Sequence, residues 1–248
     1  EDGESTLSLG YNEYKAGGGG HGLFYDCPLE ILYLGRNLSY STDSSYGYSP
    51  FYGISTLTFV TIADNVTTIG KIDLAGTVWY DNMSDGIVYC GKVLVGYKGV
   101  MPKNISVYVK EGTITIASSA FSGCTGLTSI IIPSSVTSIG NFAFNGCTSL
   151  KDLRIEDGES KLSLGYETYK SSSNGEGLFY DCPLETIYLG RRLSYSTVSS
   201  YGYSPFYGIS TLASVTLGSK ITTIPQYVFG KCGTIESLTI PASVLDID

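Results

Sequence analysis

Residues 127–150, LTSIIIPSSVTSIGNFAFNGCTSL, contain one complete unit of a repeat that runs along the chain. The unit opens with apolar residues at Leu127, Ile130 and Ile132. The end of this phrase alternates between apolar and other residues, which predicts a short strand with one buried face. The unit closes with residues 143–147, AFNGC, which we interpret as a tight apolar turn.

The strand phrase recurs throughout the sequence, and the aromatic turn recurs with it. Phe121 and Phe144 are 23 residues apart, as are Phe206 and Phe229, and this period is typical of leucine-rich repeats. One such coil cannot bury its apolar face alone, whereas stacked coils share a continuous core. The full phrases start at Leu29, Leu57, Leu127, Leu150, Leu184, Leu212 and Ile235, and a weaker one starts near Asn104.

The repeat therefore predicts a mainly β repeat solenoid, a leucine-rich-repeat right-handed coil stack of about eight coils of 23 or more residues. The phrase is missing from residues 75–103. There, residues 86–90 and 92–97 flank Gly91, which predicts an inserted β-hairpin with Trp79 packed beneath it. We expect residues 1–248 to form a single solenoid that is a fragment of a longer chain.

A longer duplication is superimposed on the repeat. Residues 1–69 return as 156–224, with about 50 identities. Residues 44–57 equal 199–212 at every position, although exposed loops normally diverge fastest. Tyr, Ser and Gly dominate this unchanged segment, as in binding loops. The candidate ligand-binding residues are Tyr40, Tyr46, Tyr48, Tyr52, Tyr195, Tyr201, Tyr203 and Tyr207.

A second interpretation of the unchanged loops remains open. A recent duplication leaves identical blocks by chance, and the tyrosines and Pro50 can pack the loop onto its own coil. The other inserted loop has diverged, because residues 16–21, AGGGGH, became SSSNGE at 171–176.

Composition excludes several partner classes. The net charge of −8 and pI of about 4.7 give no electrostatic footprint for nucleic acid. No apolar run approaches the roughly 20 residues of a membrane span, so we expect no membrane insertion by this segment. No secretory signal is visible at the start of the sequence. We expect a monomer without a cofactor.

The sequence offers no converging set of catalytic or metal-ligating groups. His21 is the only histidine, and Glu176 replaces it in the duplicate. Asp81 and Asp85 resemble part of a calcium loop, but the glutamate of such loops is missing, so we predict no metal site. The chain is therefore predicted not to be an enzyme.

The cysteines show repeat spacing rather than metal spacing. Five of them follow the turn phenylalanine, where other coils carry Ile54 or Ile209, so we predict small apolar core residues with free thiols. A Cys124–Cys147 disulfide is the alternative, because adjacent coils lie about 5 Å apart. The five are Cys27, Cys124, Cys147, Cys182 and Cys232, and Cys90 lies in the hairpin.

Residues 130–140, IIIPSSVTSIG, and 143–150, AFNGCTSL, closely resemble the BspA-like (Treponema-type) leucine-rich-repeat family of bacterial surface proteins. The resemblance covers nearly the whole chain but not the Tyr-rich insertions. It implies an extracellular or cell-surface location in host-associated bacteria, and adhesion to a host extracellular-matrix or plasma protein, such as fibronectin or fibrinogen. It carries no shared catalytic residues.

Two functions remain for the structure to address. The first is a non-catalytic, adhesin-like binding module that holds a host protein or glycan through its Tyr/Ser/Gly-rich loops. The second is a structural spacer of a larger surface protein, with no ligand of its own.

Overall fold

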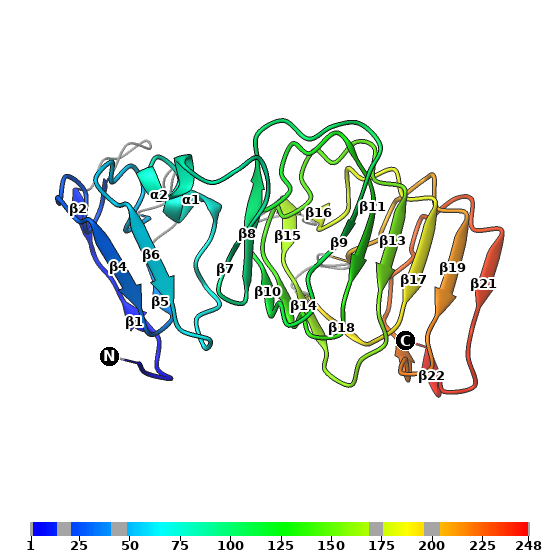
Figure 1. The fold of residues 1–248 in the computed structure, drawn as a ribbon. Coiled ribbons are helices and arrows are strands. Elements are labelled where there is room, and N and C mark those ends of the chain that lie inside the picture. Colours follow the sequence, from blue (N-terminus) through cyan, green and yellow to red (C-terminus); the bar gives the residue numbers. More distant parts are fainter. Residues whose placement is uncertain (1, 14–20, 41–48, 169–175, 196–203, 248) are drawn as a thin grey trace. The chain divides into compact units, whose positions relative to one another are not determined.

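The computed structural model describes residues 2–13, 21–40, 49–168, 176–195 and 204–247 (Figure 1). The chain divides into two compact units, Glu1–Lys98 (unit 1) and Gly99–Asp248 (unit 2).

The first sheet of unit 2, which we call the strand face, has six parallel strands, one from each successive repeat (Figure 1). The strand phrases at 127, 150, 184, 212 and 235, and the weaker one near 104, all lie in it. Register follows the repeat, since Ile130 pairs with Leu153 and Leu153 with Ile187. In order along the chain the strands are β9 (Ile105–Tyr108), β11 (Leu127–Ile132), β13 (Asp152–Ile155), β17 (Thr186–Leu189), β19 (Ser214–Leu217) and β21 (Ser237–Thr239).

Shorter parallel strands return the chain on the other side of each coil of unit 2. The apolar residues of the two walls, such as Ile132 and Ile139, are buried. The return strands are β10 (Thr115–Ile116), β12 (Ser138–Ile139), β14 (Leu162–Leu164) and β18 (Leu193–Ser194), followed by the pair β20 (Thr223–Ile224) and β22 (Asp246–Ile247). An antiparallel pair, β15 (Tyr166–Thr168) and β16 (Glu176–Gly177), flanks the inserted loop of this unit.

The turn phenylalanines of unit 2 form one stacked ladder through the core. Neighbouring rings are 5.0–5.7 Å apart between centroids and nearly parallel. Each ring closes the end of its own coil and covers the ring of the next, which explains why this position is aromatic in these five coils. The ladder consists of Phe121, Phe144, Phe179, Phe206 and Phe229.

Unit 1 contains the first copy of the duplication and folds by the same rules. Its strand phrases form the parallel pair β4 (Ile31–Leu34) and β6 (Phe59–Ile62), and Phe24 stacks on Phe51 at 5.6 Å. The return strands are β1 (Leu7–Ser8) and β5 (Leu38–Ser39), and the antiparallel pair is β2 (Tyr11–Glu13) and β3 (His21–Gly22).

The interruption of the repeat begins with two single-turn helices, α1 (Lys71–Leu74) and α2 (Val78–Asp81). Thr77 caps α2 by accepting a hydrogen bond from the N–H of Tyr80. The predicted hairpin follows as β7 (Gly86–Cys90) and β8 (Val93–Lys98), which turn at Gly91 with φ of +54°.

The fold-class prediction is confirmed: the protein is a β-solenoid of about eight turns with almost no helix. That residues 1–248 form one continuous solenoid stays a prediction.

Candidate functional site: the strand face of unit 2

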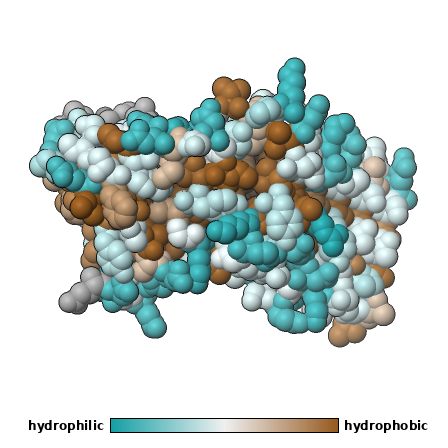
Figure 2. Space-filling model, in the orientation of Figure 1, coloured by the Kyte–Doolittle hydropathy of each residue, from teal (hydrophilic) through white to brown (hydrophobic). Residues whose placement is uncertain are grey.

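Side chains on the strand face point alternately into the core and outward. Parallel register aligns the outward residues of successive strands in rows. We call the most aromatic of these the tyrosine–arginine row. It runs through Tyr108, Ile131, Arg154, Tyr188, Thr216 and Thr239. Figure 2 shows teal and pale, mainly hydrophilic residues over β13 and β17, where the centre of this row lies.

Arg154 and Tyr188 form the centre of the row. The Arg154 guanidinium carbon lies 4.0 Å from the centroid of the Tyr188 ring, a cation–π contact between neighbouring strands. The Tyr188 hydroxyl donates to the Asp157 carboxylate, with an O–O distance of 2.6 Å. The Tyr188 ring is therefore held at its face and at its hydroxyl, so its side chain loses little further conformational freedom when a ligand binds.

Tyr108 provides a second fixed ring on β9. It is 50% exposed, and its hydroxyl donates to Glu111 Oε1 over 2.5 Å. That hydrogen bond is the main reason why the pKa of Tyr108 rises to about 12. The bond to Asp157 raises the pKa of Tyr188 in the same way. Both phenols are neutral hydrogen-bond donors in these contacts, and each ring presents an uncharged aromatic surface.

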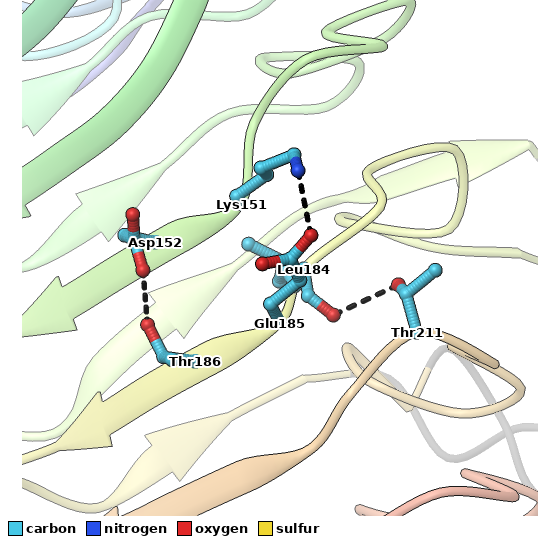
Figure 3. A network of polar contacts seen from close by, with 6 residues as sticks. All are labelled: Lys151, Asp152, Leu184, Glu185, Thr186 and Thr211. Carbon is cyan, nitrogen blue, oxygen red and sulfur yellow. Dashed lines mark hydrogen bonds and ion pairs between the residues drawn. The ribbon is translucent and has the colours of Figure 1, made fainter.

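A polar network fixes the strands beneath this row (Figure 3). Lys151 forms an ion pair with Glu185 over 2.7 Å, and Thr186 donates to Asp152, so the starts of β13 and β17 are tied together. Thr211 donates to the Leu184 carbonyl over 2.9 Å and continues the network into the next coil. The ion pair is half exposed, so its contribution is one of register more than of stability.

The tyrosines predicted from the duplication are placed only in part. Tyr40, Tyr52, Tyr195 and Tyr207 are half-buried. The Tyr40 hydroxyl donates to the buried Asp73 carboxylate, and the Lys231 ammonium lies 5.7 Å from the Tyr207 ring centroid. Tyr46, Tyr48, Tyr201 and Tyr203 lie outside the described residues, so the binding role of this set stays a prediction.

Sequence reasoning missed the tyrosine–arginine row because it used only the buried positions of each strand phrase. The row occupies the single unspecified position between the last two apolar residues. Aligning the seven phrases at that position would have shown Ile131, Arg154 and Tyr188 in three consecutive coils.

The prediction of buried core thiols is confirmed for Cys124, Cys147 and Cys182 of unit 2. None of the six cysteines, all of which the structure describes, forms a disulfide, so the alternative Cys124–Cys147 bridge is not present. The thiols of Cys147 and Cys232 donate to the Phe121 and Phe206 carbonyls of the preceding coils, over 3.2 and 2.9 Å. Two positions depart from the prediction, because Cys27 is exposed and Cys232 is only half-buried.

Within the described residues, no group of three or more His, Cys, Asp or Glu side chains is arranged to hold a metal ion. The same part of the chain contains no helix with the length and apolar character of a membrane span. Asp81 and Asp85 are exposed on either side of the end of α2 and belong to no such cluster.

The fold and its sequence repeat define a leucine-rich-repeat solenoid. Residues 114–248 match the BspA type leucine-rich repeat region in six copies, and the chain belongs to this family. The prediction made from the repeat residues is thereby confirmed, and the chain is a repeat module of a kind that is typically non-enzymatic.

Two solved bacterial structures are similar to this chain. A leucine-rich cell surface protein from Faecalibacterium prausnitzii A2-165 shares 20% identity and a TM-score of 0.41, over 87% of this chain and 61% of that one. A leucine-rich repeat protein from Bacteroides ovatus ATCC 8483 shares 18% identity and a TM-score of 0.30, over 97% and 70%. The chain thus spans 61% of the length of the Faecalibacterium protein. No curated protein matches it in sequence.

Proposed function

We propose that this chain is a non-catalytic binding module of a bacterial surface or secreted protein, and that it holds a host protein or a glycan. The observation that carries the proposal is the tyrosine–arginine row, in which the exposed Tyr108 ring and the half-buried Tyr188 ring, each fixed by a carboxylate, lie on either side of Arg154. The surface location rests on the family and on the surface protein among the structural relatives.

The chemistry of the row suits recognition rather than catalysis. Tyrosine supplies a large amphipathic contact area at low entropic cost, and Arg154 adds several hydrogen-bond donors for carboxylates or hydroxyl groups. The Tyr-rich loops, including Tyr46 and Tyr201, are proposed to extend the same kind of surface. Their composition supports this role, together with their unchanged sequence in both copies of the duplication.

The test is an array of glycans and extracellular-matrix proteins probed with the purified chain. Two sets of variants separate the two surfaces: Tyr108→Ala with Tyr188→Ala for the row, and a set of Tyr→Ala changes at 46, 48, 201 and 203 for the loops. We expect the row variant to lose at least tenfold in affinity, because buried aromatic anchors dominate binding energy. Ser163→Ala, at an exposed position of the return strand β14, is the matched control and should bind normally.

The outcomes distinguish the competing functions. Loss of binding in the loop variant alone would place the ligand on the loops and remove the row from the proposal. If the chain binds neither a glycan nor a matrix protein of the array, it is better described as the structural spacer, whose role is to hold other domains at a distance.

A further inference from the structure

The two copies of the duplication present different outward surfaces on equivalent strands. Ile31 and Phe59 in unit 1 correspond to Thr186 and Ser214 in unit 2, while Tyr33 corresponds to Tyr188. The buried positions between them stayed apolar, as the core requires. Divergence on these strands therefore changed the surface chemistry and left the fold intact.

In unit 1 the two changed residues and the unchanged Tyr33 form one contiguous apolar patch. Ile31 pairs directly with Phe59 across β4 and β6, about 4.8 Å apart, and Tyr33 follows on the same face. The three side chains are 65%, 57% and 53% exposed. Figure 2 shows brown, hydrophobic residues over these two strands. We call Ile31, Tyr33 and Phe59 the unit 1 patch. Single exposed apolar residues are ordinary, but a contiguous group marks an interaction surface.

Carboxylates flank the unit 1 patch. Asp2 accepts a hydrogen bond from the Tyr33 hydroxyl, as Asp157 does from Tyr188 in the second copy. Glu30 precedes Ile31 and has no ion-pair partner among the described residues, whereas its counterpart Glu185 is paired with Lys151.

The two copies of the duplication also differ in charge. Residues 1–98 contain 11 Asp and Glu against 5 Lys and Arg, a formal charge of −6. The second copy instead gained basic residues, because Thr6, Asn37 and Asn65 correspond to Lys161, Arg192 and Lys220. The first copy thus combines an exposed apolar patch with a net negative charge. The second copy is polar on the same strands and carries more basic residues.

We propose that the unit 1 patch is a separate docking surface for a polypeptide segment that carries apolar side chains next to Lys or Arg. Ile31 and Phe59 receive the apolar groups, and Asp2 and Glu30 attract the cations and fix the register. This proposal concerns unit 1 alone and does not depend on the ligand of the tyrosine–arginine row.

The duplication supplies the variants for the test. Ile31→Thr with Phe59→Ser gives the first copy the residues that the second copy already carries on the same strands. The reciprocal variant, Thr186→Ile with Ser214→Phe, transfers the apolar pair to the second copy. Circular dichroism melting of each variant verifies that it is folded.

The probe is a displayed library of random peptides selected on the full chain. We expect enrichment of peptides that combine apolar residues with Lys or Arg, and at least tenfold weaker binding of these peptides to Ile31→Thr/Phe59→Ser. Glu30→Gln should weaken binding less and make it less sensitive to salt. The row variant Tyr108→Ala/Tyr188→Ala should bind the peptides normally, which separates this surface from the proposed function.

Four results would overturn the proposal. They are the absence of any enriched peptide, enriched peptides without basic residues, and equal binding to the wild type and Ile31→Thr/Phe59→Ser. The fourth is a dimer in analytical ultracentrifugation that this variant abolishes, because the patch would then be covered by a second copy of the chain.

Discussion

At the scale of single residues, Asp73 is the most constrained titratable group that the structure describes. It is buried on α1 and accepts hydrogen bonds from the hydroxyls of Tyr40 and Ser49 and from the Gly70 N–H. In the second copy Val228 takes its place, and the Ser204 hydroxyl instead donates to the Tyr227 carbonyl over 2.9 Å. Two nearly identical segments are therefore anchored by different means.

Asp73 predicts a pH dependence of the stability of unit 1. Burial raises the pKa of Asp73 above its ordinary value of 3.8, although its hydrogen bonds oppose this shift. The folded state then binds the proton more tightly than the unfolded state. The contribution of Asp73 to stability is therefore fully present below pH 3.8 and is lost as the pH rises through the folded-state pKa.

The measurement is thermal unfolding followed by the fluorescence of Trp79, the only tryptophan, which lies on α2. The melting temperature of the wild type relative to Asp73→Asn should therefore fall as the pH rises above about 4. Asp64→Asn is the control, because Asp64 is exposed in its ion pair with Lys92 and exposed ion pairs contribute little to stability. A difference that rises with pH would show that the Asp73 pKa is lowered instead.

At the same scale, the sequence alone does not predict which of two adjacent arginines is buried. Arg191 and Arg192 are adjacent and look alike in sequence, but Arg191 is fully buried and Arg192 is exposed. The Arg191 guanidinium donates to the Pro133 and Ser134 carbonyls over 2.9 and 2.8 Å, which bridges two coils across an intervening one. No periodicity predicts such a contact, because it depends on loops that are brought together only by stacking. The burial of Asp73 and its hydrogen bonds to Tyr40 and Ser49 were not predicted for the same reason.

At the scale of the structural element, the strand phrase predicts where each strand of the main parallel sheets lies, which face it buries and which strand it pairs with. Each phrase is a strand in the structure, because alternation decides which face is buried and the 23-residue period decides which strand is its neighbour. The same alternation also encodes the tyrosine–arginine row and the unit 1 patch. What the sequence cannot show is the fixation of Tyr108 and Tyr188 by carboxylates, which requires loop geometry.

The close packing of successive coils predicts the cost of a single added methyl group. At Gly177, on β16, an added Cβ would lie 2.0 Å from the Ser204 carbonyl oxygen, and at Gly22 it would lie 2.0 Å from that of Ser49. Both copies of the duplication thus keep glycine where two coils touch. Gly177→Ala should reduce the free energy of unfolding by about 1–3 kcal/mol, as overpacking of a tight core does.

Gly233 is the matched control for this change. An added Cβ there meets nothing within 4 Å, so Gly233→Ala should alter the stability by no more than about 0.5 kcal/mol. Urea unfolding followed by circular dichroism measures both. Equal midpoints for the two variants would show that the coils can separate at Gly177 without loss.

At the scale of the whole molecule, a solenoid is stabilised by contacts between neighbouring coils, so damage should spread locally. Phe144 stacks on Phe121 at 5.6 Å and on Phe179 at 5.0 Å, and it is fully buried. Phe144→Ala should cost about 3–5 kcal/mol, because it removes a core ring and leaves a cavity between two others. Phe142→Ala, two residues away at a partly exposed ring, should cost far less.

Hydrogen exchange followed by mass spectrometry determines how far the damage extends. We expect Phe144→Ala to lower the protection of β11, β13 and the adjoining coils of unit 2, while β4 and β6 of unit 1 keep theirs. Trp79 fluorescence should accordingly show an unchanged transition for unit 1, and circular dichroism an earlier one for the rest. If protection falls equally in both units, the chain unfolds as one cooperative body, and the two compact units are not independent in stability.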